Sequence, residues 1–317
     1  MNLHTHVVAE DVDAIKLFVE QGGDVNVQDE AGQTPLDWAV FDGRTEVTRA
    51  LIDLGAVVDS RDFNGAQAIH WASSKGHLEE LALLLEQGAD INAVQVDGRG
   101  ALSLASEFGR VEVTRTLLKA GASVDGNSGE GSPLCYAAEF GCSEVIRVLL
   151  EAGAEINRVG DEKTPLQWAA EYGHGEAVGI LLAAGAGLEA CGEDGRSPLV
   201  LASAFGHTEV VRQLIAAGAA LHPEEGQYAA LCAASELGEL GIARILLDAG
   251  VNVNHREEDK APLHWAAEGN HLDVLTLLLE RGADSALTTS VTGLSALALA
   301  KVAGSMEAEE HLTSLQG

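Results

Sequence analysis

A glycine followed by a small apolar residue recurs along almost the whole chain at one nearly constant spacing. The pair is found at eight places, always 32 or 33 residues apart: Gly55-Ala56, Gly88-Ala89, Gly121-Ala122, Gly153-Ala154, Gly185-Ala186, Gly218-Ala219, Gly250-Val251 and Gly282-Ala283. A fixed period of this length is typical of repeat arrays, in which each unit contacts only its neighbours. The spacing therefore predicts a row of stacked units rather than a chain folded around one central core.

An aliphatic residue near the start of each unit recurs at nearly the same spacing as the glycine pair. It is found at Leu36, Ile69, Leu102, Leu134, Leu166, Leu199, Leu231 and Leu263, with Leu297 two residues late. The segment 161–186 shows one complete unit, which contains Thr164-Pro165-Leu166, Ala169-Ala170, Gly173, Leu181-Leu182 and Gly185-Ala186.

This unit predicts two helices joined by a short turn. Pro165 suits the first turn of a helix, and Thr164 can cap the open backbone N–H groups. The apolar side of that first helix is formed by Leu166, Ala169, Ala170 and Gly173. A second helix is expected over 175–183, with Val178, Leu181 and Leu182 facing the first, and Gly185 is expected to end it in the left-handed conformation.

These motifs resemble the ankyrin repeat, a 33-residue unit marked by T-P-L-H-x-A. The resemblance is carried by Thr34-Pro35-Leu36, Ser132-Pro133-Leu134, Thr164-Pro165-Leu166, Ser197-Pro198-Leu199 and Pro262-Leu263-His264-Trp265-Ala266-Ala267; Ala68-Ile69-His70 and Gly100-Ala101-Leu102 lack the proline. It implies an all-α solenoid of helix-turn-helix repeats with β-hairpin finger loops. We expect a single domain over 1–317, with an N-terminal partial repeat (1–26), eight full repeats (27–285) and a C-terminal capping repeat (286–317).

The charge balance restricts the class of partner. The chain has 19 basic and 49 acidic residues and a formal net charge of -30. Nucleic-acid binding needs clustered Lys and Arg, and an anionic membrane would repel this chain, so we expect neither partner. A basic or amphipathic protein segment would be attracted instead.

The cysteines and the apolar runs point to an intracellular protein. Cys135, Cys142, Cys191 and Cys232 show no C-x-x-C spacing, and four cysteines in a chain of 317 residues do not indicate a disulfide framework. The N-terminus lacks the pattern of a secretory signal, and no apolar run is long enough to span a bilayer. We expect a cytoplasmic monomer, with the nucleus as an open alternative.

The predicted binding face is the side of the first helix opposite its alanines. The resemblance to the ankyrin repeat implies that this side lines a concave groove. All four tryptophans, Trp38, Trp71, Trp168 and Trp265, fall at one repeat position, together with Leu104, Tyr136 and Leu201. One turn later, five consecutive repeats carry the residues that we call the ladder residues: Phe108, Phe140, Tyr172, Phe205 and Leu237. Contiguous exposed apolar surface usually marks a contact site, and aromatic anchors are typical of interface hot spots.

Glutamates directly precede most ladder residues: Glu107, Glu139, Glu171 and Glu236, with Ala204 as the exception and Glu268 in the following repeat. The expected groove is therefore both aromatic and acidic. For the tryptophans we favour a structural role, in which they are wedged between neighbouring inner helices and seal the stack. For the ladder residues both interpretations, a structural role and a contact site, stay open.

A second candidate surface is formed by acidic finger loops, with Glu193-Asp194, Glu224-Glu225 and Glu257-Glu258-Asp259. The leading hypothesis is a non-enzymatic protein-interaction scaffold or adaptor that binds its partner in the groove. The alternative is a structural spacer or regulatory subunit that contacts partners through these loops.

No catalytic or cofactor motif accompanies the repeats. The sequence lacks G-x-S-x-G, P-loop, H-E-x-x-H and Rossmann patterns, so we expect no enzyme activity and no cofactor. The pairs His70/His77 and His264/His271 belong to the repeat signature, which favours structural hydrogen bonding over metal binding. In the ankyrin family, asparagines at positions like Asn26, Asn92, Asn157 and Asn254 can be hydroxylated, although a turn-forming role explains them more simply.

Overall fold

The computed structural model describes residues 3–126, 131–192, 195–221, 229–257 and 259–314. Within these ranges the chain forms twenty α-helices and no strand. Contacts between residues divide the chain into two compact units, Met1–Asp161 and Glu162–Gly317, which we call the N-terminal and C-terminal units. Each contains helices in consecutive pairs, as the repeats predict. The single domain over 1–317 stays a prediction.

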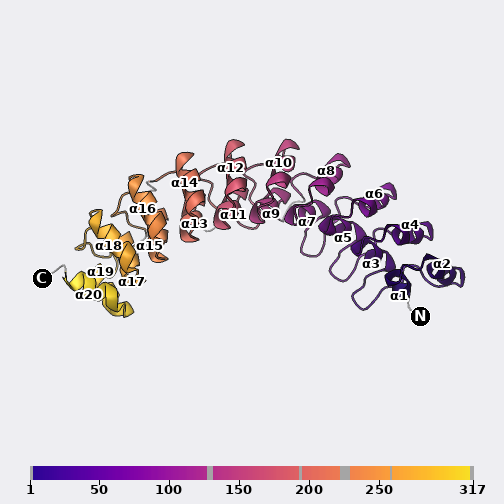
Figure 1. Ribbon diagram of the computed structural model, residues 1–317, viewed down its shortest axis with the longest axis horizontal. Helices are drawn as coiled ribbons and strands as arrows, with labels where there is room; N and C mark the ends of the chain where they lie inside the picture. Colours follow the sequence, from indigo (N-terminus) through magenta and orange to yellow (C-terminus); the bar gives the residue numbers. More distant parts are fainter. Residues whose placement is uncertain (1–2, 127–130, 193–194, 222–228, 258, 315–317) are drawn as a thin grey trace. The chain divides into compact units, whose positions relative to one another are not determined.

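The N-terminal unit has two layers of helices (Figure 1). Within each layer a helix contacts the equivalent helix of the next pair. The first helices of the pairs are α1 (Leu3–Val8), α3 (Pro35–Phe41), α5 (Ala68–Lys75), α7 (Ala101–Glu107) and α9 (Pro133–Glu139). The second helices are α2 (Val12–Glu20), α4 (Thr45–Asp53), α6 (Leu78–Glu86), α8 (Val111–Lys119) and α10 (Ser143–Glu151).

The C-terminal unit repeats this arrangement within itself. Its first helices are α11 (Pro165–Glu171), α13 (Pro198–Ala204), α15 (Ala230–Glu236), α17 (Pro262–Glu268) and α19 (Ala296–Ala303). Its second helices are α12 (Gly175–Ala183), α14 (Thr208–Ala216), α16 (Leu240–Asp248), α18 (Leu272–Glu280) and α20 (Met306–Ser314). On α20 only Ala308 and Leu312 are buried, so most of this last helix faces water.

The helices begin where the sequence predicts them to begin. Pro35, Pro133, Pro165, Pro198 and Pro262 each occupy the first turn of a first helix. Hydroxyls of Thr34, Ser132, Thr164 and Ser197 accept a hydrogen bond from the third backbone N–H of the helix. Each cap satisfies one of the donors that a helix leaves open at its N-terminus.

The helices also end as predicted. Gly185 follows α12 with φ of 91°, and Gly55, Gly121 and Gly250 follow their second helices with φ between 90° and 98°. Residues other than glycine rarely adopt this left-handed backbone conformation, which explains why glycine recurs at the end of each unit.

Small residues on the first helices let the layers pack closely. Leu166, Ala169 and Ala170 of α11 are at most 1% exposed, and Val178 and Leu181 of α12 are fully buried. The same positions are buried in every pair from α3 to α18 for which they are apolar, so the core runs along each unit between the two layers.

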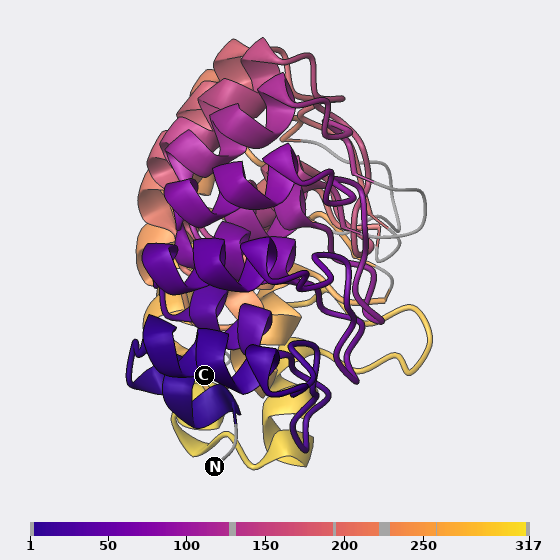
Figure 2. The same cartoon turned by 90° about the vertical axis from the view of Figure 1, so that its right-hand side faces the viewer.

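The loops between pairs lie on one side of the helices in the N-terminal unit (Figure 2). Among the described residues, the loops of the two units contain only isolated antiparallel bridges in place of paired strands: Val94 with Gly100 in the N-terminal unit, and Glu257 with Lys260 and Thr288 with Ser295 in the C-terminal unit. A carboxylate organises such a loop: Oδ1 of Asp62 accepts the backbone N–H groups of Asn64 and Ala66, each at 2.8 Å. The turn is tight because of these bonds, and it leaves little backbone to form a longer ladder.

Successive pairs are joined by a side chain that caps the helix before it. In several repeats, the side chain two residues after the position of the ladder residues donates a hydrogen bond to a carbonyl near the end of the preceding first helix. Examples are His77 to Val40 O (2.8 Å), Arg110 to Ser74 O (2.9 Å), His207 to Glu171 O (2.6 Å), His271 to Glu236 O (2.8 Å) and Ser305 to Glu268 O (2.8 Å). These donors satisfy carbonyls that a helix leaves open at its C-terminus.

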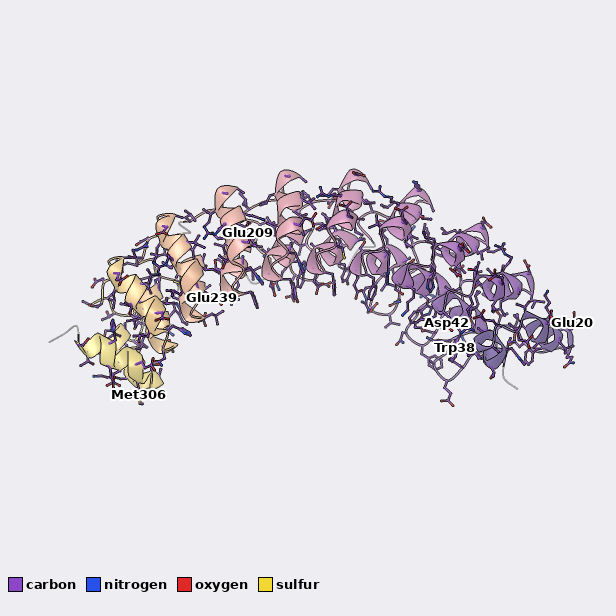
Figure 3. All side chains as sticks on the ribbon, in the orientation of Figure 1. Glu20, Trp38, Asp42, Glu209, Glu239 and Met306 are labelled. Carbon is purple, nitrogen blue, oxygen red and sulfur yellow. The ribbon has the colours of Figure 1, made fainter. Side chains whose placement is uncertain are left out.

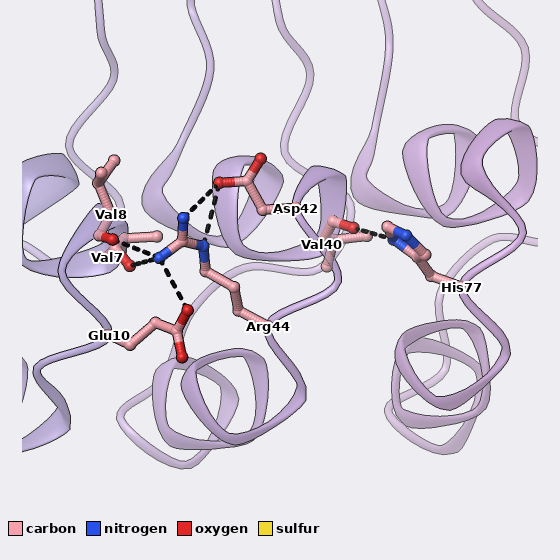
Figure 4. Close-up of polar contacts among 7 residues, drawn as sticks. All are labelled: Val7, Val8, Glu10, Val40, Asp42, Arg44 and His77. Atoms are coloured by element: carbon pink, nitrogen blue, oxygen red, sulfur yellow. Dashed lines mark hydrogen bonds and ion pairs between the residues drawn. The ribbon is translucent and has the colours of Figure 1, made fainter.

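Arg44 makes the most extensive of these caps (Figure 4). Its Nη1 donates to the carbonyls of Val7 and Val8 at the end of α1, and its guanidinium pairs with Glu10 at 3.4 Å and Asp42 at 2.9 Å. The first helix pair is therefore held to the second partly by a single half-buried guanidinium.

Replacing Arg44 by alanine is expected to destabilise the pair α1–α2 selectively, by about 2 kcal/mol, because charge-assisted bonds to two carbonyls are lost. Amide hydrogen exchange would show faster exchange in α1 and α2 and unchanged exchange in α8. Arg49→Ala is the matched control, since Arg49 is exposed on the neighbouring helix α4. Equal exchange in the two variants would contradict the prediction.

Candidate functional site

The ladder residues lie directly after the last helical residue of their first helices. Phe108 and Phe140 follow α7 and α9 in the N-terminal unit, and Tyr172, Phe205 and Leu237 follow α11, α13 and α15 in the C-terminal unit. Their exposed fractions lie between 49% and 53%. We call the side of the first helices that carries them the first-helix face. Each unit thus presents a row of half-exposed apolar side chains on neighbouring helices.

The tryptophan position is less exposed than the ladder. Leu104 and Leu201 are only 5% and 1% exposed, while Tyr136, Trp168 and the other three tryptophans are half-buried. Trp168 stacks on Tyr172 with ring centroids 6.1 Å apart, and Nε1 of Trp38 donates to Asp29 at 2.9 Å. The low exposure of Leu104 and Leu201 agrees with a role in sealing the stack between neighbouring helices. The tryptophans and Tyr136 at the same position keep part of their rings exposed.

Tyr136 is also held by its surroundings. Burial and the nearby Asp161 carboxylate raise the pKa of its phenol, so the hydroxyl stays protonated. The uncharged hydroxyl is hydrogen-bonded to the side chain of Asp161, so it connects α9 to the loop that follows α10.

Three of the five glutamates named above have cationic partners inside the chain. Arg99 contacts Glu107 at 2.8 Å and Lys163 contacts Glu171 at 2.7 Å, and Lys260 pairs with Glu268. The Nζ atoms of the two lysines also lie over tryptophan rings, Lys163 over Trp168 at 4.3 Å and Lys260 over Trp265 at 4.0 Å.

Because of these ion pairs, the face carries less exposed negative charge than the sequence predicts. The side chains of Glu107 and Glu171 are only 13% and 14% exposed, and Glu139 is half-buried. Among the described glutamates of the set, Glu236 is exposed. The helical spacing could not show that a residue eight positions earlier in the loop reaches back to neutralise three of these carboxylates. A signal was present, because Arg99/Glu107, Lys163/Glu171 and Lys260/Glu268 share this separation.

The acidic finger loops are described only in part. Glu193, Asp194, Glu224, Glu225 and Glu258 lie outside the described residues. Glu257 is 9% exposed and accepts the Ala229 N–H at 3.0 Å. Asp259 accepts hydrogen bonds from Ser290 Oγ at 2.6 Å and Val291 N at 2.7 Å. Both carboxylates therefore connect one repeat to another.

The asparagines named above also connect repeats. Oδ1 of Asn26, Asn92 and Asn254 accepts the backbone N–H of Val57, Ser123 and Asp284 respectively, at 2.8 to 3.0 Å. Asn157 is exposed at the equivalent position. Sequence reasoning assigned these asparagines to their own turns, whereas the side-chain oxygens bind the turn of the next repeat. Their hydroxylation stays a prediction.

The repeat-signature histidines are structural hydrogen-bonding groups. Nδ1 of His70 accepts the Gln67 N–H at 3.0 Å, so the proton lies on Nε2, which donates to Ala93 O at 2.9 Å. His264 makes the equivalent bonds with Ala261 and Leu287. Burial lowers the pKa of both imidazoles, which keeps them neutral.

Gln167, in the C-terminal unit, makes the same two kinds of hydrogen bond as His70. Its Oε1 accepts the Thr164 N–H and its Nε2 donates to Arg196 O, both at 2.8 Å. A glutamine can thus replace the signature histidine bond for bond, which the sequence pattern alone did not indicate.

Metal sites and membrane-spanning helices are two further features that the described part of the chain lacks. No group of three or more His, Cys, Asp or Glu side chains is arranged to hold a metal ion there. None of the described helices combines the length and apolar character that crossing a membrane requires.

Comparisons with known proteins agree with this architecture. A family model described as ankyrin repeats (3 copies) matches residues 3–95, 83–160, 158–224 and 220–289. The Homo sapiens protein named Protein phosphatase 1 regulatory subunit 27 is 42% identical over 50 residues, which cover 16% of this chain and 32% of that protein. The match thus spans about a third of that relative. Because the family model covers nearly the whole chain, this protein belongs to the ankyrin repeat family.

Proposed function

We propose that this protein is a non-enzymatic adaptor that binds a partner protein on the first-helix face. The observation that carries the proposal is the exposed row of Tyr172, Phe205 and Leu237 on the neighbouring helices α11, α13 and α15. Each exposes about half of its surface at the same position of its repeat. A partner that covers these side chains would gain hydrophobic free energy, because their apolar surface would be removed from water.

The occupant that fits this row is an amphipathic segment. Its apolar side chains would pack on the ladder residues, and basic residues on its other side would be attracted by the net charge of -30. Glu236 is an exposed carboxylate next to the row and could pair with such a residue. Because Glu171 is paired with Lys163, the overall charge supports a basic segment more than the glutamate row does.

A regulatory subunit is a second candidate function. It is favoured by the short match to a protein whose name describes a phosphatase regulatory subunit. In this candidate the chain would contact an enzyme without being one. The cytoplasmic location and monomeric state expected from the sequence stay predictions.

The double substitution Tyr172→Ala/Phe205→Ala tests the binding face. Partners would be identified by affinity purification and mass spectrometry, and binding of the purified partner measured by calorimetry. The expected loss of affinity is about 100-fold, as for two hot-spot residues. Binding should largely persist at high salt, because the contact is mainly apolar.

The matched control is Val291→Ala/Met306→Ala. These side chains of the same unit are 82% and 69% exposed. Val291 lies in the loop before α19, and Met306 lies at the start of α20 (Figure 3). The control should bind as the unaltered chain does. If the double alanine variant keeps its helical content and full affinity, the first-helix face is not the binding site.

A further inference from the structure

The first-helix face of the N-terminal unit contains a hollow whose lining includes several residues outside the ladder. It has a volume of about 370 Å³ and is lined by residues at the ends of α3, α5 and α7. Phe41, Trp71 and Phe108 supply aromatic walls. Phe41 and Phe108 are 41% and 49% exposed, and the Phe41 and Trp71 rings meet edge to face with centroids 5.4 Å apart.

The hollow is also lined by three cations, Lys75, Arg99 and Arg110. Arg99 is neutralised by Asp97 at 2.7 Å and Glu107 at 2.8 Å. Lys75 lies over the Phe41 ring with Nζ 4.1 Å from its centroid, and Nε of Arg110 donates to a backbone carbonyl, Ser74 O. Neither Lys75 nor Arg110 contacts a carboxylate among the described residues.

Lys75 and Arg110 thus line one hollow together without a carboxylate partner among the described residues, in a chain that has 49 acidic residues and 19 basic ones. The repeat pattern itself changes here. Lys75 occupies the ladder position of its repeat, and in the preceding repeat Asp42 does, with Phe41 one residue earlier. The face therefore changes from apolar to cationic and aromatic at this hollow.

We propose that this hollow binds a segment of a partner protein that carries a carboxylate next to an apolar side chain. The apolar side chain packs against Phe41 and Phe108, and the carboxylate pairs with Lys75 and Arg110. Such a pair gains strength where aromatic walls exclude water from part of it. A basic side chain would meet two cations, so this site selects the opposite charge to the one that the net charge of the chain favours.

The inference rests on the proposed function in one respect, that the ligand is a protein. It concerns a different place, because the row tested by Tyr172 and Phe205 belongs to the C-terminal unit. The two proposals therefore can fail separately.

Selection of phage-displayed random dodecapeptides on the immobilised full chain provides the probe. The expected consensus contains Asp or Glu within two residues of Leu, Phe or Trp. The consensus peptide is then synthesised with a fluorescent label, and its affinity for protein variants is measured by fluorescence anisotropy. Its affinity should fall as the salt concentration rises, because an ion pair contributes.

Lys75→Glu is expected to weaken binding of this peptide at least tenfold, and so is Phe108→Ala. The matched control is Lys119→Glu, which makes the same charge change at an exposed residue of the same unit, at the end of α8. It should stay within twofold of the unaltered chain. Because Lys75 and Phe108 are both exposed, all three variants are expected to fold. Thermal melts followed by circular dichroism check this.

Several outcomes would overturn the proposal. These are a basic or uncharged consensus, the absence of any enriched peptide, and an acidic peptide whose binding Lys75→Glu leaves unchanged. An enriched peptide that is lost only in Tyr172→Ala/Phe205→Ala would support the proposed function while excluding the hollow. If the partner protein fails to depend on Tyr172 and Phe205 but the acidic peptide depends on Lys75, the hollow stands and the first proposal fails.

Discussion

Alanine in place of His70 is expected to lower the free energy of unfolding by about 3 kcal/mol, because two buried backbone groups lose their partners. The imidazole is fully buried and connects the N–H of Gln67 to the carbonyl of Ala93 in the next loop. A cavity adds to this loss. The midpoint of urea unfolding at pH 7.5, followed by circular dichroism, measures the effect.

Glutamine at the same position is the control that isolates the hydrogen bonds. Gln167 shows that a carboxamide can accept the N-cap N–H and donate to the next loop at once. His70→Gln should therefore cost less than about 1 kcal/mol. If the alanine and glutamine variants unfold at the same urea concentration, the bridging hydrogen bonds contribute nothing.

The signature position of the preceding repeat should behave in the opposite way. Asp37 is 3% exposed, and burial raises the pKa of its carboxyl to about 6, although Thr34 donates two hydrogen bonds to Oδ2. A carboxyl whose pKa is higher in the folded state stabilises the fold when protonated and loses that contribution as pH rises through about 6. Asp37→Asn is therefore expected to stabilise the chain at pH 7.5, by roughly 3 kcal/mol.

The pH dependence of this gain distinguishes it from a packing effect. At pH 5 the gain should fall to about half, because the folded carboxyl is then mostly protonated. Asp53→Asn is the matched control, an exposed carboxylate on α4 that should change stability by less than about 0.5 kcal/mol. Equal gains for Asp37→Asn at pH 5 and pH 7.5 would contradict the assignment of charge burial.

The sequence determined the repeat and its helices closely. Thr164 and Pro165 begin α11, Gly185 follows α12, and the second helix spans Gly175–Ala183 as predicted. These features depend on residues within one unit, where capping, φ preference and helical periodicity are local. The ladder residues were placed on an exposed face for the same reason.

Contacts between repeats were less accessible to sequence reasoning. That Lys163 neutralises Glu171, or that Asn26 accepts the N–H of Val57, depends on how a loop returns to a helix or meets the next loop. No periodicity in one helix encodes that path. The hollow near Lys75 was missed for a related reason, because Phe41 and Lys75, which line it beside Trp71 and Phe108, depart from the repeat pattern.

The caps between pairs point one way along the chain. His207 and His271 each donate to a carbonyl that lies 36 and 35 residues earlier, so a repeat supplies the ending of the one before it. During synthesis the N-terminal part emerges first. A first helix that is capped in this way therefore keeps an open carbonyl end until the next repeat has left the ribosome.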